Sequence, residues 1–214
     1  MLVKDRMTPD PITITPDTSF PDAFRILREK KIRHLPVMKK KKLVGIVTQT
    51  DMLHASPSAA TSLSVFEINY LLANLHVKEV MTSPPITVSE DDPLEEAARV
   101  MVEKKIGCLP VMRNGDLVGM ITEIDIFETF VEILGSEAAS LRVTLRIRDA
   151  RGELARLAGV IAGLGGNICS VAAFRGEDQE HRYITFRLEG VDEDTLIAKL
   201  EAEAEKVVHV CCAA

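Results

Sequence analysis

The stretch IRHLPVMKKKKLVGIVTQTD, residues 32–51, returns as IGCLPVMRNGDLVGMITEID at residues 106–125. The similarity extends outward without a gap, so that residues 7–53 align with residues 81–127 at a spacing of 74, and 21 of the 47 pairs are identical. An internal repeat of this length indicates a structural unit that occurs twice. Two copies of one unit predict two similar sites related by an approximate twofold axis. This favours paired ligand binding over a single catalytic centre.

Each copy predicts the same order of elements. An extended segment (residues 12–14 and 86–88) leads into a helix with apolar residues at spacings of three and four. We expect Thr18 and Asp92 to cap these helices. Two strands follow, joined in the second copy by a turn at residues 114–115, whose Asn-Gly sequence favours a hairpin. A short helix closes each copy, which gives a βαββα unit.

The region between the copies and the region after them have patterns of their own. From residue 141 the order is strand, helix, two strands, helix and strand, which predicts the ferredoxin-like βαββαβ arrangement. The fold class is therefore α+β. A connecting helix is expected from apolar residues between the copies: Leu63, Phe66, Tyr70 and Leu71. The expected parts of the chain are residues 1–60, residues 61–135 with the connecting helix, and residues 140–214.

Composition narrows the classes of function. Charged residues make up 27% of the chain and the net charge is −6, which argues against non-specific binding of nucleic acid. The lysine run at residues 39–42 aligns with the hairpin turn of the second copy, so we expect a solvated turn. No apolar run is long enough to span a membrane. The four cysteines have no disulfide spacing, and we expect a cytoplasmic protein without membrane contact.

We expect no enzyme, because no catalytic constellation is present. The five histidines are scattered, and the chain has neither an HExxH motif nor a nucleophile elbow. Cys108 lies within a predicted strand and is expected to be packed rather than nucleophilic. The tail around His209 alternates with valines like a strand. We therefore expect no catalytic residue, no metal site and no catalytic cofactor.

Three motifs recur in both copies: a Met-Thr start, a Leu-Pro-Val strand, and an ending in which Gly is followed by Thr-x-x-Asp. With these motifs the repeats resemble CBS domains, and two in tandem resemble a Bateman module. The repeated ending comprises Gly45, Thr48 and Asp51 in the first copy and Gly119, Thr122 and Asp125 in the second. Each glycine stands in the middle of a strand, where it permits close backbone approach.

The resemblance implies that an adenine nucleotide of the AMP, ADP or ATP type binds in the cleft of the pair. In such domains the aspartate binds the ribose, a role that falls here to Asp51 and Asp125. Thr48 and Thr122 would give supporting contacts, and the free amides at the following helix start would favour a phosphate. The adenine would lie near the first extended segments, at Thr13, Ile14, Thr87 and Val88.

Two alternatives stay open at these sites. Thr-x-x-Asp also fits a helix capping box, and its repetition does not separate the two interpretations. Arg33 and His34 of the first copy align with Gly107 and Cys108 of the second. In one interpretation, Arg33 or His34 contacts a phosphate. In the other, Arg33 lies on the surface and His34 is hydrogen-bonded at a strand start. We predict that one site binds an anionic adenine nucleotide more tightly than the other.

The C-terminal region resembles an ACT domain, a regulatory fold that in many relatives binds amino acids. The motifs Asp-x-x-Gly-x-Leu and Gly-Asn-Ile carry this resemblance, and it implies ligand contacts at Asp149, Gly152, Leu154, Asn167 and Ile168. Members usually have proline where this chain has Arg151, and some amino-acid binders have a polar residue at Ile147. The order CBS–CBS–ACT resembles the AcuB family of acetoin utilisation proteins.

We therefore expect a regulatory ligand-sensing protein. Its CBS pair would bind an adenosyl nucleotide, and its ACT domain would pair subunits or bind an amino acid or another small metabolite. Both resembled families commonly dimerise, so a homodimer is expected, together with an unidentified regulated protein. The alternative is a non-catalytic dimeric scaffold or interaction subunit whose CBS pair binds no nucleotide.

Overall fold

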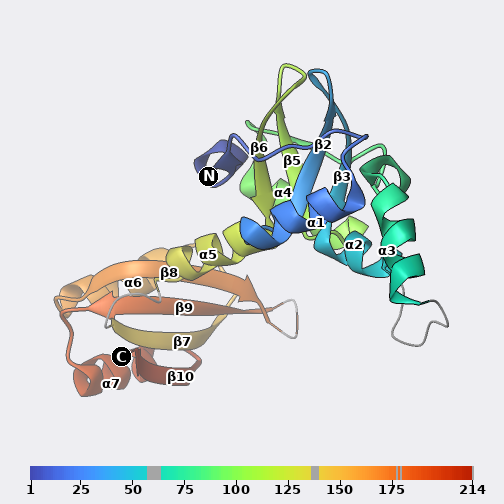
Figure 1. The fold of residues 1–214 in the computed structure, drawn as a ribbon. Helices are drawn as coiled ribbons and strands as arrows, with labels where there is room; N and C mark the ends of the chain where they lie inside the picture. The colour runs from blue at the N-terminus through green and yellow to red at the C-terminus, as the bar shows by residue number, and fades with distance from the viewer. Residues whose placement is uncertain (57–63, 136–139, 177, 179, 214) are drawn as a thin grey trace. The chain divides into compact units, whose positions relative to one another are not determined.

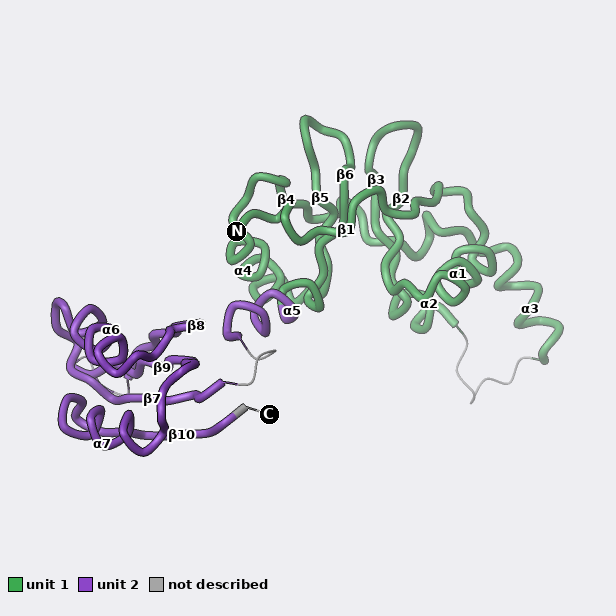
Figure 2. The backbone as a smooth tube through the Cα atoms, turned by 90° about the vertical axis from the view of Figure 1, so that its left-hand side faces the viewer, with its two compact units in different colours: residues 1–126 green, residues 127–214 purple. Residues whose placement is uncertain are grey.

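The computed structural model describes residues 1–56, 64–135, 140–176, 178 and 180–213. The chain forms two compact units, Met1–Ile126 and Phe127–Ala214 (Figures 1 and 2). Nearly all of the repeat lies in the first unit, and the βαββαβ region lies in the second. Leu63, expected in the connecting helix, is outside the described residues. Within the described ranges, no helix is long and apolar enough to cross a membrane.

The expected extended segment of the first copy, residues 12–14, is not a strand and forms an isolated bridge from Ile14 to Val37. The first copy has the expected helices and hairpin strands. They are α1 (Phe20–Glu29), β2 (His34–Lys39), β3 (Lys42–Thr48) and α2 (Gln49–Ala55). Phe20 and Leu27 lie on the buried face of α1, in accord with the apolar spacing. The predicted cap at Thr18 is wrong by one residue. Ser19 accepts the hydrogen bond from the amide of Asp22, at 3.2 Å.

The second copy repeats this order after the connecting helix. The elements are α3 (Val65–Asn74), β4 (Val88–Ser89), α4 (Leu94–Lys104), β5 (Cys108–Arg113), β6 (Asp116–Thr122) and α5 (Glu123–Ile133). Asn114 and Gly115 have φ angles of 52° and 90°, which confirms the predicted tight hairpin turn. The predicted cap at Asp92 is wrong, because Pro93 occupies the N-cap position. The Asp92 carboxylate instead accepts from the amide of Ser89, at 2.8 Å.

The start of each copy pairs with the sheet of the other copy. The short strand β1 (Thr8–Pro9) runs antiparallel to β6 of the second copy. In the same way, Thr82 and Ile46 exchange backbone hydrogen bonds of 2.9 and 3.1 Å. The two hairpins, β2–β3 and β5–β6, consequently lie side by side (Figures 1 and 2). This exchange decides which residues of one copy can reach the other copy's site.

The two mid-strand glycines make this exchange possible. A Cβ atom at Gly45 would lie 2.6 Å from the sulfur of Met81, and one at Gly119 would lie 2.5 Å from the sulfur of Met7. Real Cβ atoms do not approach other atoms so closely. The predicted close approach at these glycines is therefore confirmed, and the segment that approaches is the Met-Thr start of the other copy.

The second unit is a four-stranded antiparallel sheet with two helices. Its elements are β7 (Ser140–Arg148), α6 (Glu153–Gly163), β8 (Asn167–Arg175), β9 (His181–Glu189), α7 (Glu193–Glu203) and β10 (Lys206–Ala213). The strand order β10-β7-β9-β8 is that of a ferredoxin-like fold, as predicted. Val143 and Leu145 of β7 are fully buried against Leu157 and Ile161 of α6. The alternation that predicted β7 therefore reflects the core face of this sheet.

Candidate functional site

A cleft of about 460 Å³ lies between the two copies of the repeat in the first unit. It forms where β3 ends and α2 begins, opposite the start of β5. The first copy contributes Arg33, His34, Thr48 and Asp51, among others. The second copy contributes Thr82, Ile86, Lys105, Gly107, Cys108 and Glu123, among others. The cleft therefore combines polar side chains from two strand–helix junctions with apolar groups from the exchanged segment.

Four of the ten residues predicted for nucleotide binding line this cleft: Arg33, His34, Thr48 and Asp51. Thr122 and Asp125 occupy the equivalent junction of the second copy and do not line it. Ile14 and Val88 are buried in the cores of their own copies, while Thr13 and Thr87 are exposed. The structure brings Ile86, rather than residue 13 or 14, into the cleft with Asp51. The sequence did not indicate that the start of each copy pairs with the sheet of the other copy, and this long-range exchange decides which segment lines the cleft.

The capping box that the sequence left open is present at the start of α2. Oδ2 of Asp51 accepts hydrogen bonds from the amide and from the hydroxyl of Thr48, both at 2.8 Å. The Thr48 hydroxyl accepts in turn from the amide of Asp51, at 3.1 Å. Oδ1 of Asp51 has no hydrogen-bond partner among the described residues. One carboxylate oxygen is thus used by the helix cap, and the other remains available to a ligand.

The start of α2 offers less to a phosphate than the sequence suggested. The Gln49 amide donates to the carbonyl of Arg33 at 2.9 Å, and the Asp51 amide donates to Thr48. Two of the first three amides of the helix are therefore already engaged. A phosphate in this cleft would depend on side chains, and the cationic candidates that line it are Arg33 and Lys105.

Charges of opposite sign face each other across the cleft. Nη1 of Arg33 lies 3.7 Å from Oε1 of Glu123, and both side chains are about half exposed. Burial, assisted by the neighbouring Arg33, lowers the pKa of His34, so His34 is neutral near pH 7. Burial raises the pKa of the Cys108 thiol to about 12, and this side chain is packed as predicted.

The second strand–helix junction repeats the two hydrogen bonds that the aspartate carboxylate accepts from the threonine. Oδ2 of Asp125 accepts from the amide of Thr122 at 2.7 Å and from its hydroxyl at 2.8 Å. Each junction therefore has the same type of threonine–aspartate contact, and the two junctions differ in the surrounding side chains. Arg33 and Gln49 of the first copy stand where the second copy has Gly107 and Glu123.

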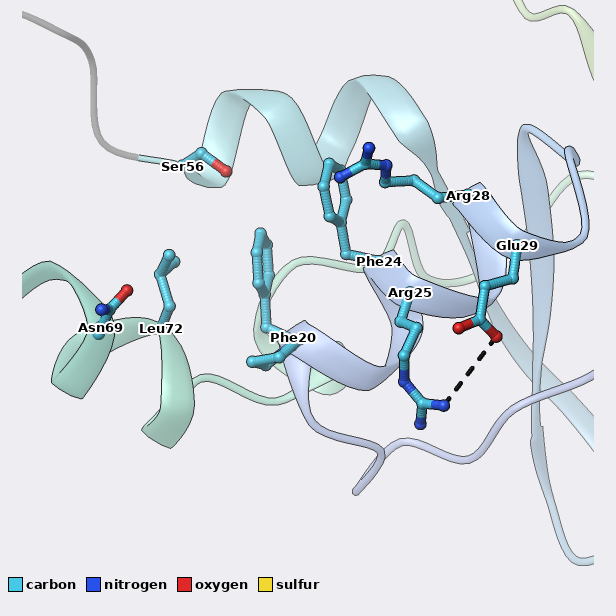
Figure 3. A pocket seen from close by; sticks show the side chains of 9 residues that line it. Phe20, Phe24, Arg25, Arg28, Glu29, Ser56, Asn69 and Leu72 are labelled. Atoms are coloured by element: carbon cyan, nitrogen blue, oxygen red, sulfur yellow. Dashed lines mark ion pairs between the residues drawn. The ribbon is translucent and has the colours of Figure 1, made fainter.

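A second, larger hollow of about 650 Å³ lies between α1 and α3 (Figure 3). The rings of Phe20 and Phe24, stacked with centroids 6.2 Å apart, point toward it. Arg25 is already paired with Asp22 at 2.8 Å and with Glu29 at 4.0 Å. None of the predicted site residues lines this hollow. Its volume therefore does not make it the better candidate for the ligand site.

The predicted ligand residues of the second unit lie around the start of α6 and of β8. Asp149 pairs with Nε of Arg182 at 2.7 Å. Gly152 has a φ of 88° at the start of α6, Leu154 and Asn167 are exposed, and Ile168 packs against the core. A cavity of about 450 Å³ nearby is lined by other residues, including Glu153, Arg156 and Glu203. The five predicted residues do not line this cavity, and ligand binding by them stays a prediction.

Family models match three segments of the chain. The CBS domain model matches residues 3–58 and 77–132, which together are more than half of the chain. The chain belongs to the CBS-domain family. The model of the TTHA0829-like ACT domain matches residues 139–211. The protein is thus a CBS pair followed by an ACT-like domain, as the sequence motifs predicted.

Solved structures that resemble the CBS pair support this assignment. A Vibrio cholerae protein described as the acetoin utilization protein AcuB is 34% identical, with a TM-score of 0.52 over 63% of this chain and 93% of that chain. The CBS pair of MJ0100, solved with 5′-methylthioadenosine and S-adenosylmethionine, is 32% identical over 62% and 97%, with a TM-score of 0.52. CBSX2 from Arabidopsis thaliana, solved with AMP, is 33% identical over 62% and 97%, with a TM-score of 0.51.

The curated relatives are mostly longer proteins. The chain spans 22%, 47% and 23% of the first three that it matches, and two of these three are named as enzymes. The similarity to each covers between 55% and 60% of this chain. CBS and ACT domains are regulatory modules, and the two enzymes carry CBS domains as regulatory parts.

Proposed function

We propose that this protein is a regulatory sensor that binds an adenosyl ligand of the AMP, ADP or ATP type in the cleft beside Asp51. One observation carries the proposal. Asp51 lines the cleft, and its Oδ2 atom forms the helix cap while Oδ1 has no partner among the described residues. A carboxylate oxygen in this position can accept hydrogen bonds from ribose hydroxyl groups.

The solved relatives support this choice of ligand. CBSX2 was solved with AMP, and the CBS pair of MJ0100 with two other adenosyl compounds. The groups that line the cleft suit such a ligand, because Ile86 and Pro110 offer apolar surface for a base while Arg33 and Lys105 offer positive charge. The site is asymmetric, so we propose that the cleft beside Asp51 binds the anionic nucleotide more tightly than the site beside Asp125.

The ACT domain pairs subunits or binds an amino acid or another small metabolite, and the protein acts as a homodimer without catalysing a reaction. Ligand binding shifts an equilibrium between conformations that exist before binding, and a regulated partner protein responds to that shift. The similarity to AcuB supports a link to acetoin utilisation.

Thermal unfolding in the presence of a ligand panel tests the sensor against the scaffold alternative. The panel contains AMP, ADP, ATP, 5′-methylthioadenosine, S-adenosylmethionine and the common amino acids. A ligand at 100 times its Kd stabilises the folded state by about 2.7 kcal/mol and raises the unfolding temperature. Stabilisation by an adenosyl compound supports the sensor. If no compound changes the unfolding temperature, the CBS pair is a scaffold.

A further inference from the structure

The copies of the repeat differ at two pairs of positions that meet in the cleft. Arg33 of the first copy aligns with Gly107 of the second, and Glu123 of the second copy aligns with Gln49 of the first. The two charged residues approach each other, with Nη1 of Arg33 lying 3.7 Å from Oε1 of Glu123. A Cβ atom at residue 107 would lie 3.2 Å from Oε2 of Glu123. The glycine therefore leaves the space in which the Glu123 carboxylate lies.

The backbone treats these positions alike in both copies. The Gln49 amide donates to the carbonyl of Arg33 at 2.9 Å, and the Glu123 amide donates to the carbonyl of Gly107 at 3.0 Å. The two junctions therefore have equivalent backbone hydrogen bonds, and the side chains make the difference. Two differences between the copies, Arg33 against Gly107 and Glu123 against Gln49, together produce one ion pair in the cleft.

This ion pair balances the charge of the cleft. Its described lining includes two cations, Arg33 and Lys105, and two carboxylates, Asp51 and Glu123. His34 adds no positive charge near pH 7, because burial and Arg33 lower its pKa. A nucleoside triphosphate that pairs with Arg33 would have to break the ion pair with Glu123. Its phosphates would then lie close to the Glu123 carboxylate. A neutral adenosyl compound would disturb neither charge.

We propose that Glu123 is a specificity-determining residue, which makes the cleft favour adenosyl compounds of low negative charge, such as AMP or a thioadenosine, over nucleoside triphosphates. This inference rests on the proposed function and refines its ligand class. Glu123 acts in two ways. It forms an ion pair with Arg33, and it adds a negative charge to the lining of the cleft.

Titration calorimetry with 5′-methylthioadenosine and with ATP tests the inference, because both probes contain the same adenosine. The wild type binds the thioadenosine more tightly than ATP. Glu123→Gln binds ATP about tenfold more tightly than the wild type does, since it removes one repulsive charge and releases Arg33. Its affinity for the thioadenosine stays within about twofold. The ion pair is half exposed, so Glu123→Gln retains the fold.

Two further variants serve as controls. Glu128→Gln removes the same charge further along α5, outside the residues that line the cleft, and leaves both affinities unchanged. Gln49→Glu adds a carboxylate at the equivalent position of the first copy. This variant binds ATP more weakly than the wild type does. An unchanged ratio of the two affinities in Glu123→Gln, or tighter binding of ATP by the wild type, overturns the inference and leaves the proposed function standing. No binding of either probe by any variant overturns both.

Discussion

At the scale of single residues, Gly45 and Gly119 show how the repeat is held together. Each lies in the middle of a strand, and each faces the Met-Thr segment of the other copy at a distance that excludes a Cβ atom. Around Gly45 the nearest groups are the flexible side chain of Met81 and the backbone carbonyl of Thr82. The side chain can move, whereas the carbonyl is held by its hydrogen bond to Ile46.

Gly45→Ala is therefore expected to lower the free energy of unfolding by about 1–3 kcal/mol, the usual cost of overpacking. Urea denaturation of the full chain measures this cost. Gly159→Ala is the matched control, because no atom would lie within 4 Å of its Cβ and the residue is within helix α6. The control is expected to stabilise its helix slightly. Equal stability of Gly45→Ala and the wild type would contradict the exchange of segments between copies.

Cys108 gives a second test at this scale. Burial and the nearby carboxylate of Asp51 raise its pKa to about 12, so at pH 8 the thiol is almost entirely protonated. The thiolate is the reactive form, and we expect Cys108 to resist a thiol reagent in the folded protein while exposed Cys169 reacts first. Peptide mapping by mass spectrometry gives the order of labelling. In urea all four cysteines should react, and fast labelling of Cys108 without urea would contradict its packing.

At the scale of elements, the short helix α2 combines a structural and a functional role in one carboxylate. Asp51 caps the helix through Oδ2. Removing such a cap costs about 1 kcal/mol, so a variant that loses both roles cannot separate them. Glutamate is the usual residue at this position of a capping box. Asp51→Glu therefore keeps the cap and moves the carboxylate by one methylene.

We expect Asp51→Glu to change the free energy of unfolding by less than about 0.5 kcal/mol and to weaken AMP binding by at least about tenfold. Asp51→Ala should lose both stability and binding. Urea denaturation and calorimetry on the same samples separate the two effects. Undiminished AMP affinity in Asp51→Glu, together with unchanged stability, would leave Asp51 with a structural role and no ligand.

The elements were largely predictable from the sequence, because their apolar periodicity and turn residues are local signals. The hairpin at Asn114–Gly115, the connecting helix and the order of the ferredoxin-like unit followed from such signals. Helix starts were off by one residue at Thr18 and Asp92, where neighbouring residues compete for the cap. Which residues line the cleft was harder to predict from the sequence. The exchange of the Met-Thr segments is a long-range pairing, and it brought Ile86 rather than residues 13–14 to Asp51.

The partners of Arg33 were also missed, although the sequence contained a usable signal. Arg33 aligns with Gly107 and Gln49 aligns with Glu123, so a positive charge is gained in one copy and a negative charge in the other. One copy has an added positive charge and the other has an added negative charge. Such a combination indicates an ion pair between the two copies. Of these two differences between the copies, only the one at Arg33 was used to predict the site.

At the scale of the whole molecule, the connecting helix α3 exposes apolar side chains. Phe66 and Tyr70 are 87% and 71% exposed, and Val65 and Leu71 are exposed on the same helix. We expect this surface to be covered in the proposed homodimer. Phe66→Glu combined with Tyr70→Glu should yield a monomer without loss of stability, because neither side chain is buried in the chain itself.

Light scattering after size-exclusion chromatography measures the mass of each variant. Val102→Glu is the matched control, since Val102 is 77% exposed on α4 away from this helix, and it should remain dimeric. A wild-type monomer, or a dimer that survives both substitutions in α3, would show that this helix does not pair subunits.

We have proposed that the cleft beside Asp51 is the tighter of two unequal adenosyl sites. Isothermal titration of AMP into the wild type, Asp51→Ala and Asp125→Ala tests it most directly. We predict that Asp51→Ala weakens the tighter binding event by at least about tenfold, while Asp125→Ala changes it by less than about threefold. Equal losses from the two substitutions would contradict the asymmetry, and undiminished binding by Asp51→Ala would contradict the site itself.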